Sequence, residues 1–375
     1  MELLDHPLDK RLTPKGAEAN RIASRVQENM TRNLILVSVN IPSGLAGDIA
    51  QDRYPRTDFF ELSKRLNASI ISFNDIDGAT RWLDKFVRIA FGRSVALALE
   101  GFRRRNNFDL VFTPSETIGM PLALFLKLFG ANKKHLMIGH RLSPPKKAFL
   151  WKLLKLRTHI STVFVYSSVQ KDFVVNDLFT PSQQVVQIPF MADQQFFRPM
   201  PEIPERHQVC SVGLEWRDYP TLIEAANGLN CDVKIAAGSL WSKGKNEAEG
   251  RQVPTNVDVR KYKYPELRKL YAESKIVVIP LYQTDFQAGI TSILEAMAMG
   301  KPVIVTKTAG QTDTIIDGET GLYVSPGDPN DLRKKIHYLL ENETERRRIA
   351  DNGLRAFQNS FTLDHLVARI GEQAT

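Results

Sequence analysis

A strand, a loop, a helix and a second strand follow one another in the last third of the chain, and this unit restricts the fold most. The apolar β-branched run at 276–279 is typical of a strand buried on both faces of a parallel sheet. A helix is predicted over 289–299, because Gly300 and Pro302 supply the usual C-terminal signals. Val303-Ile304-Val305 then forms the next strand, so the pattern predicts a parallel α/β sheet.

The loop before this helix has the features of an anion site. Free N–H groups and the positive end of the helix dipole favour a phosphate at a helix start. Gly289 has no Cβ, so a ligand could approach the backbone there. Glu295 lies about a turn and a half into the helix, where its carboxylate could accept hydrogen bonds from sugar hydroxyls. The alternatives are an ordinary loop glycine and a solvated glutamate.

Length and composition predict a soluble protein of two domains. A chain of 375 residues exceeds what one hydrophobic core serves, and 43% hydrophobic with 25% charged residues is a globular composition. No apolar run reaches the ~18–20 residues of a membrane span, and the N-terminus lacks a signal-peptide layout. Cys210 and Cys231 match no metal spacing and are predicted to be buried free thiols in a reducing compartment. We therefore expect a cytoplasmic protein without metal or cofactor.

Positive charge is concentrated in the first half of the chain. Residues 1–200 contain 28 Lys and Arg against 18 Asp and Glu, and no acidic residue occurs over 117–170. An anionic membrane surface, an acidic acceptor or nucleic acid would suit this charge, and nucleic acid ranks last because no such motif accompanies it. The basic, leucine-rich segment 145–157 suits an interfacial helix on the inner face of a membrane, although its leucines could instead pack on the sheet.

Strands and helices alternate through the first half, which favours a doubly wound parallel sheet. Gly44, Glu116 and His140 each follow one of these strands, at the sheet edge where ligands collect in such folds. Each could equally serve turn geometry or local structure. The predicted strands are 34–39, 68–73, 110–113, 134–138, 162–166 and 184–188, and the predicted helices are 17–27, 58–66, 82–102 and 121–129.

Three motifs in the second half resemble the donor half of the family 4 glycosyltransferases, which are retaining enzymes of GT-B architecture. They are Leu294-Glu295-Ala296-Met297-Ala298-Met299-Gly300-Lys301-Pro302-Val303-Ile304, Asp317-Gly318-Glu319-Thr320-Gly321-Leu322-Tyr323-Val324 and Pro326-Gly327-Asp328. The resemblance implies two Rossmann-like doubly wound domains facing across a cleft. It suggests an acceptor-binding domain at 1–198, a nucleotide-sugar-binding domain at 199–355, and a segment at 356–375 that crosses back to the first domain.

The resemblance also implies roles for individual residues. The family places two glutamates eight positions apart: Glu295 matches the second, whereas Gln287 replaces the first with a neutral amide. Arg217 takes the place of a phosphate-binding lysine, and Leu214 stands where the family has an arginine. The remaining candidate site residues are Gly213, Lys243, Gly289, Ile290 and Thr291 for the donor, His140 for the donor sugar, and Gly44 and Glu116 on the acceptor side. Lys243 and Glu116 are placed there by their positions in loops after predicted strands.

The predicted function is transfer of a sugar, as by a hexosyltransferase, from a nucleotide-diphosphate donor to a glycan, lipid-linked or small-molecule acceptor. The anomeric configuration would be retained. The alternatives are a sugar-nucleotide epimerase of the same architecture and a GT-B-like binding protein without turnover. The second alternative is motivated by Gln287 and by the missing arginine at position 214.

Overall fold

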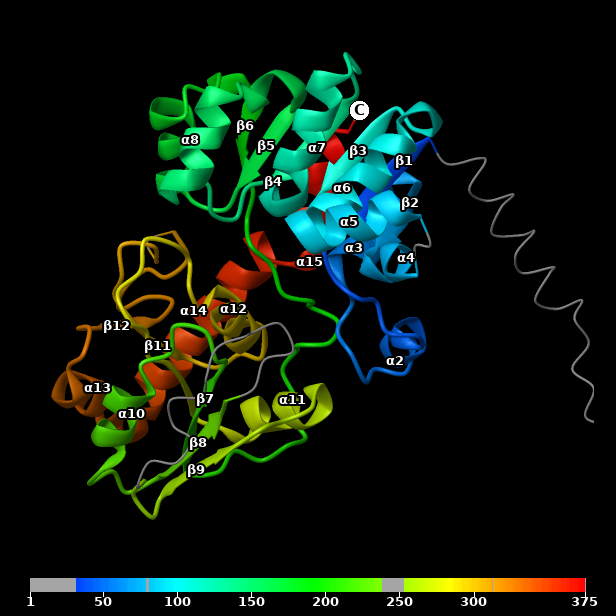
Figure 1. Ribbon diagram of the computed structural model, residues 1–375. Helices are drawn as coiled ribbons and strands as arrows, with labels where there is room; N and C mark the ends of the chain where they lie inside the picture. Colours follow the sequence, from blue (N-terminus) through cyan, green and yellow to red (C-terminus); the bar gives the residue numbers. More distant parts are fainter. Residues whose placement is uncertain (1–31, 79–80, 238–252, 312, 375) are drawn as a thin grey trace, which may run out of the picture.

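The computed structural model describes residues 32–78, 81–237, 253–311 and 313–374, and it contains two α/β domains, one above the other in Figure 1. Each domain is built on a six-stranded sheet in which every strand pairing is parallel. The helix predicted at 17–27 lies outside the described residues. Within them, no helix is long and apolar enough to cross a bilayer.

The first sheet has the strand order β2-β1-β3-β4-β5-β6. Its strands are β1 (Asn33–Val37), β2 (Ala68–Ser72), β3 (Leu110–Thr113), β4 (Lys134–Ile138), β5 (Thr162–Val165) and β6 (Val185–Gln187). Its helices are α2 (Leu45–Ala50), α3 (Asp58–Leu66), α4 (Phe73–Asp77), α5 (Trp82–Phe91), α6 (Arg93–Arg103), α7 (Glu116–Leu128), α8 (Pro145–Leu153) and α9 (Ser168–Asp172), with short 3₁₀ and π turns at Arg105–Asn107, Leu156–His159, Phe173–Asp177 and Ser182–Gln184.

The second sheet has the strand order β12-β11-β10-β7-β8-β9. Its strands are β7 (Gln208–Val212), β8 (Asp232–Ala236), β9 (Val257–Arg260), β10 (Ile276–Ile279), β11 (Val303–Thr306) and β12 (Leu322–Val324). The helices after β7 are α10 (Tyr219–Ala226), α11 (Tyr264–Glu273), α12 (Ile290–Ala298), α13 (Pro329–Glu341), α14 (Glu343–Ser360) and α15 (Leu363–Glu372). The predicted strand-helix-strand unit is β10, α12 and β11.

Helices cover both faces of the first sheet. Alternate residues of each buried strand point to opposite faces and so pack against different helices. Ile35 and Val37 of β1 pack in one core with α3 and α15, whereas Leu34 and Leu36 pack in another with α6 and α7. That second face continues to α8, whose Trp151 is fully buried beside residues of β4 and β5. Burial on both faces explains why the strands of the first sheet consist largely of consecutive apolar residues.

Two predicted helices differ from the structure. The single helix expected over 82–102 is two helices, α5 and α6, because Gly92 between them has φ +88°, which an α-helix cannot accommodate. The helix expected from Pro121 begins five residues earlier. Ser115 caps its first turn by accepting a hydrogen bond from the N–H of Thr117, so Pro121 falls inside α7.

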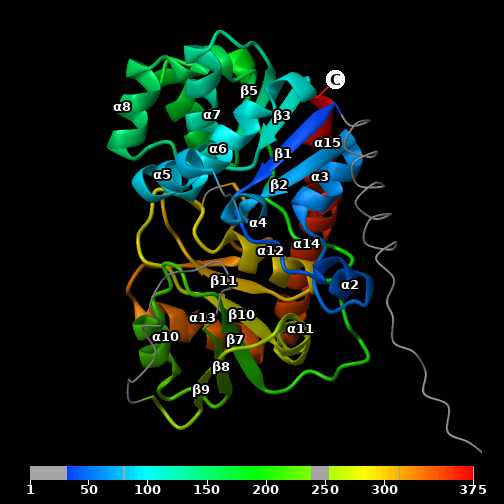
Figure 2. The same ribbon diagram turned by 45° about the vertical axis from the view of Figure 1, so that its right-hand side comes forward.

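The chain passes between the domains twice, and the two passages lie side by side. The first is the segment between β6 and β7, and the second joins α14 to α15. The N–H of Ala192 donates to the carbonyl of Phe361 at 3.1 Å, and the N–H of Leu363 donates to the carbonyl of Ala192 at 3.0 Å. Figure 2 shows α14 rising from the second domain toward α15 beside the first. The domain boundaries at 198 and 355 stay a prediction.

Replacing Leu366 by alanine should destabilise the first domain, although this residue lies near the end of the chain. Leu366 is fully buried in the core that α15 shares with α3 and the first sheet. Removing a buried leucine side chain costs about 2–4 kcal/mol of unfolding free energy. Denaturant unfolding measures this loss. Arg369→Ala on the solvent side of α15 is the matched control and should cost less than about 0.5 kcal/mol.

Candidate active site

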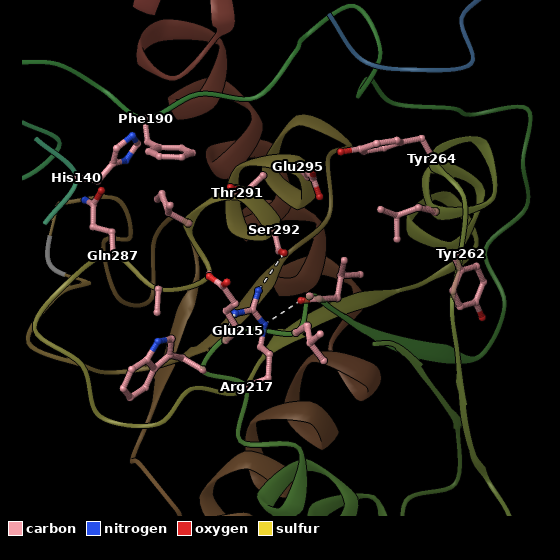
Figure 3. Close-up of a pocket in the computed structure, with 18 of the residues that line it drawn as sticks. His140, Phe190, Glu215, Arg217, Tyr262, Tyr264, Gln287, Thr291, Ser292 and Glu295 are labelled. Atoms are coloured by element: carbon pink, nitrogen blue, oxygen red, sulfur yellow. Dashed lines mark hydrogen bonds between the residues drawn. The ribbon is translucent and has the colours of Figure 1, made fainter. Parts of the chain in front are cut away.

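Arg217 occupies the carboxyl edge of the second sheet, in the loop between β7 and α10. Its side chain is buried, with 5% of the residue exposed. The guanidinium donates from Nε to the carbonyl of Val212 at 2.9 Å, from Nη1 to the carbonyl of Glu215 at 2.8 Å, and from Nη2 to Oγ of Ser292 at 3.1 Å. Figure 3 shows the side chain reaching from its loop to the first turn of α12. These bonds fix the cation in place.

Two glycines make room for this guanidinium. Gly213 has φ +108°, and a Cβ there would lie 2.2 Å from Nη2 of Arg217. Gly289 has φ +78°, and a Cβ there would lie 2.9 Å from Cγ2 of Ile279 and 3.3 Å from Nη1 of Arg217. Both positions combine a left-handed backbone with a close approach, which glycine alone tolerates without strain.

The hydrogen-bond acceptors of Arg217 are neutral groups, namely two backbone carbonyls and a serine hydroxyl, and none is a carboxylate. None of the ion pairs within the described ranges includes Arg217. Burial lowers the pKa of Arg217, while nearby groups that include Glu295 and Glu215 act in the opposite direction, and arginine remains protonated. The first turn of α12 adds the N–H groups of Ile290 and Thr291 and the positive end of the helix dipole, and no side chain caps this helix. A buried cation beside an uncapped helix start is complementary to an anion such as a diphosphate.

Glu295 projects from α12 in the same site and is 6% exposed. Tyr271 donates its hydroxyl to Oε2 of Glu295 at 2.8 Å. Burial raises the pKa of Glu295 to about 7, while the hydrogen bond from Tyr271 and the charge of Arg217 act in the opposite direction. The carboxylate therefore changes its charge near neutral pH.

A cavity of about 850 Å³ joins these groups to the first domain. Arg141 of the first domain donates from Nη2 to Asp285 of the second at 3.0 Å, and the N–H of Ser168 donates to Asp313 at 2.9 Å. The predicted site residues that line the cavity are His140, Gly213, Arg217, Gln287, Gly289, Ile290, Thr291 and Glu295.

Gln287 and His140 meet where the two domains face each other across the cavity (Figure 3). Nε2 of His140 lies 2.8 Å from the carbonyl of Pro114, which can only accept, so this nitrogen carries the proton. Oε1 of Gln287 is buried and has no hydrogen-bond partner among the described residues. A buried amide oxygen without a donor is costly, so Oε1 of Gln287 can accept a hydrogen bond from a group in the cavity.

Two other predicted site residues, Glu116 and Gly44, do not line this cavity. Glu116 is 3% exposed. It accepts a hydrogen bond from the backbone N–H of His140 at 3.0 Å and forms an ion pair with Lys147, so it holds the loop of His140 in place. Gly44 has φ +101° at the start of α2. Lys243 lies outside the described residues. The acceptor-side roles of Gly44 and Glu116 stay predictions.

Aromatic residues that were not predicted form much of the cavity wall. Tyr166 follows β5 directly and Trp216 lies in the loop after β7, so their positions at strand ends could have signalled them. Tyr54 comes from the segment between α2 and α3 and packs against Tyr264 of the second domain, with ring centroids 4.5 Å apart. Nothing local in the sequence indicates that contact. The others are Phe190, Tyr262 and Phe286.

Comparison with known proteins places these features in a family context. Residues 213–356 match the family model "Glycosyl transferases group 1". An uncharacterized glycosyltransferase of Methanocaldococcus jannaschii is 29% identical over 147 residues, which are 39% of this chain and 41% of that protein. The capsular polysaccharide biosynthesis glycosyltransferase CapM of Staphylococcus aureus is 37% identical over 92 residues, 24% of this chain and 23% of CapM. The matches thus span about two fifths or less of these relatives.

Solved structures match nearly the whole chain. HepE of Anabaena, crystallised in complex with UDP-glucose, has a TM-score of 0.68 at 15% identity over 91% of this chain and 98% of that chain. Sucrose-phosphate synthase of Thermosynechococcus elongatus has a TM-score of 0.68 at 17% identity, with the same coverage. The chain has the GT-B fold of two Rossmann-like domains, which confirms the predicted fold class.

Replacing Glu295 by glutamine should stabilise the unliganded protein more at high pH than at low pH. The pKa of about 7 in the folded state exceeds the ordinary value of 4.5, so ionisation opposes folding as pH rises through this window. The gain in unfolding free energy should be about 2 kcal/mol larger at pH 8.5 than at pH 5.5. Denaturant titrations at both values measure it.

Glu319→Gln is the matched control, because this carboxylate is exposed, and its effect should not change with pH. A gain for Glu295→Gln that is the same at both pH values would contradict the raised pKa.

Proposed function

We propose that the protein is a retaining glycosyltransferase of family 4 type that moves a hexose from a nucleoside-diphosphate sugar to an acceptor. The observation that carries the proposal is the buried Arg217 guanidinium beside the start of α12, which has neutral partners in the described structure. A leaving diphosphate would complete this arrangement, because its negative charge would lie beside the guanidinium.

The donor would extend from Glu295 to Gln287 along the cavity. The carboxylate of Glu295 accepts hydrogen bonds from the ribose hydroxyls, and the diphosphate docks on Arg217 and on the N–H groups of Ile290 and Thr291. The sugar then reaches the domain interface, where a hydroxyl donates to the unpartnered Oε1 of Gln287 and His140 contacts the same ring. On this proposal Arg217 and α12 balance the diphosphate charge, without a metal ion or cofactor.

Transfer would proceed on one face of the sugar. The acceptor oxygen bonds to the anomeric carbon on the side from which the diphosphate departs, and the acceptor proton passes to a leaving phosphate oxygen. Arg217 stabilises the charge that develops on that oxygen. Gln287 is neutral, so it orients the sugar without stabilising positive charge on the ring.

The known ligands of similar proteins support a hexose donor. HepE of Anabaena has been crystallised with UDP-glucose and with UDP and glucose, and another relative is an α-(1→4)-mannosyltransferase. The acceptor is a glycan, a lipid-linked sugar or a small molecule. Cavity-lining Tyr262 and Tyr264 follow β9 and offer aromatic surface for the nucleotide base.

Replacing Arg217 by glutamine should weaken binding of a nucleoside diphosphate about 10- to 100-fold, since a charge-assisted contact is lost. Titration calorimetry with UDP, GDP and ADP measures the affinity. Arg333→Gln is the matched control: this arginine also donates to backbone carbonyls of the second domain, those of Ala225 at 3.0 Å and Glu224 at 2.8 Å, but it does not line the cavity. Equal losses in both variants would show a folding effect and contradict the proposed role of Arg217.

A thermal-shift panel of UDP-, GDP- and ADP-sugars should identify the donor, because a ligand of the folded state raises the melting temperature. With that donor and an acceptor, NMR should show a product with the anomeric configuration of the donor. Inversion would overturn the proposed mechanism. Interconversion of the donor without an acceptor would indicate an epimerase, and tight binding without transfer or hydrolysis would indicate a binding protein.

A further inference from the structure

Helix α5 presents an apolar face that no described part of the chain covers. Trp82, Phe86 and Ile89 follow one another at helical spacing on one side of this ten-residue helix, and their exposed fractions are 77%, 55% and 83%. None of the residues of α5 is buried. Large side chains exposed together in this way mark an interaction surface.

The opposite side of α5 is fixed to the protein, so this apolar face has a set direction. Asp84 forms an ion pair with Arg103 of α6, and Arg88 pairs with Asp77 at 3.4 Å. Val87 packs against the core beneath α6 and α7. With Asp84 and Val87 turned inward, Trp82, Phe86 and Ile89 lie on the side of α5 that points away from the first sheet.

The charge next to this face is positive and unpaired. Arg81 and Lys85 flank the apolar residues, and no ion pair in the described ranges includes either. The two acidic residues nearest in sequence, Asp77 and Asp84, are already paired with arginines. Arg81 and Lys85 are therefore available to an anionic partner.

Helix α8 repeats this combination farther along the same side of the sheet. Phe149 and Leu153 are each 61% exposed, while Trp151 of the same helix is fully buried. Lys146 and Lys152 have no carboxylate partner among the described residues, whereas Lys147 pairs with Glu116. In Figure 2 both α5 and α8 lie at the left-hand side of the first domain.

We propose that α5 docks on an anionic lipid bilayer, with Trp82, Phe86 and Ile89 inserted at the interface and Arg81 and Lys85 among the headgroups. Apolar side chains flanked by cations are what an interfacial helix needs. A second copy of the chain fits less well, because like charges would face each other. A helix of ten residues, about 15 Å long, also offers less than the ~800 Å² per partner of a stable interface. The proposal goes beyond glycosyl transfer and does not depend on it.

Sedimentation with vesicles tests the docking. The full chain should pellet with vesicles of phosphatidylcholine and 30% phosphatidylglycerol, and at least about tenfold less with phosphatidylcholine alone. The Trp82→Ser/Ile89→Ser variant should lose roughly tenfold or more in partitioning, and Arg81→Gln/Lys85→Gln roughly three- to tenfold. Nucleoside-diphosphate binding should stay unchanged, because none of these residues lines the cavity.

Matched controls come from exposed positions of the second domain. Ile316→Ser/Tyr338→Ser removes apolar side chains that are 57% and 44% exposed, and Lys334→Gln/Lys335→Gln removes two charges of α13. Both should pellet within about twofold of the original protein. Equal pelleting by the α5 variants, or equal binding to neutral vesicles, would overturn the proposal. A concentration-dependent dimer that α5 substitutions abolish, without vesicle binding, would overturn it in favour of a protein interface.

Discussion

A buried guanidinium that forms no ion pair within the described residues is the constraint on which the second-domain side of the cavity depends. Arg217 uses its hydrogen bonds on two carbonyls and a serine, and these contacts hold its loop against the first turn of α12. Gly213 and Gly289 are glycines because a larger residue would collide with that guanidinium or its neighbours. The contacts that order this loop therefore also fix a positive charge at the wall of the cavity.

Sequence patterns predicted the fold well because most of its signals are local. Runs of β-branched residues identified the buried strands β10 and β11, and glycine and proline placed the end of α12. The errors arose where local signals conflict with backbone geometry. The amphipathic pattern over 82–102 continues through Gly92, yet the positive φ of Gly92 separates α5 from α6. Pro121 predicts a helix start, because proline favours the first turn, yet it is the sixth residue of α7.

The grouping of residues at the cavity was predictable where one segment supplies several of them. Gly289, Ile290, Thr291 and Glu295 are neighbours on one loop and helix, so their meeting in space follows from the helix alone. The contacts of Glu116 were not predictable, because they require two separate loops and the side chain of Lys147 to converge. The packing of Tyr54 on Tyr264 joins the two domains, and nothing in either local sequence encodes it. Tertiary packing sets such contacts.

The paired passages between the domains determine how the cavity can open. Because Ala192 is hydrogen-bonded to both Phe361 and Leu363, the two connections act as one pivot at one side of the molecule. Arg56 reinforces that pivot by binding Asp193 at 2.8 Å and Asp364 at 3.1 Å. Two connections that are hydrogen-bonded to each other oppose sliding and twisting of one domain against the other, and they leave rotation about a hinge. A swing about this pivot would part the ion pair of Arg141 with Asp285, which joins the domains outside the two passages.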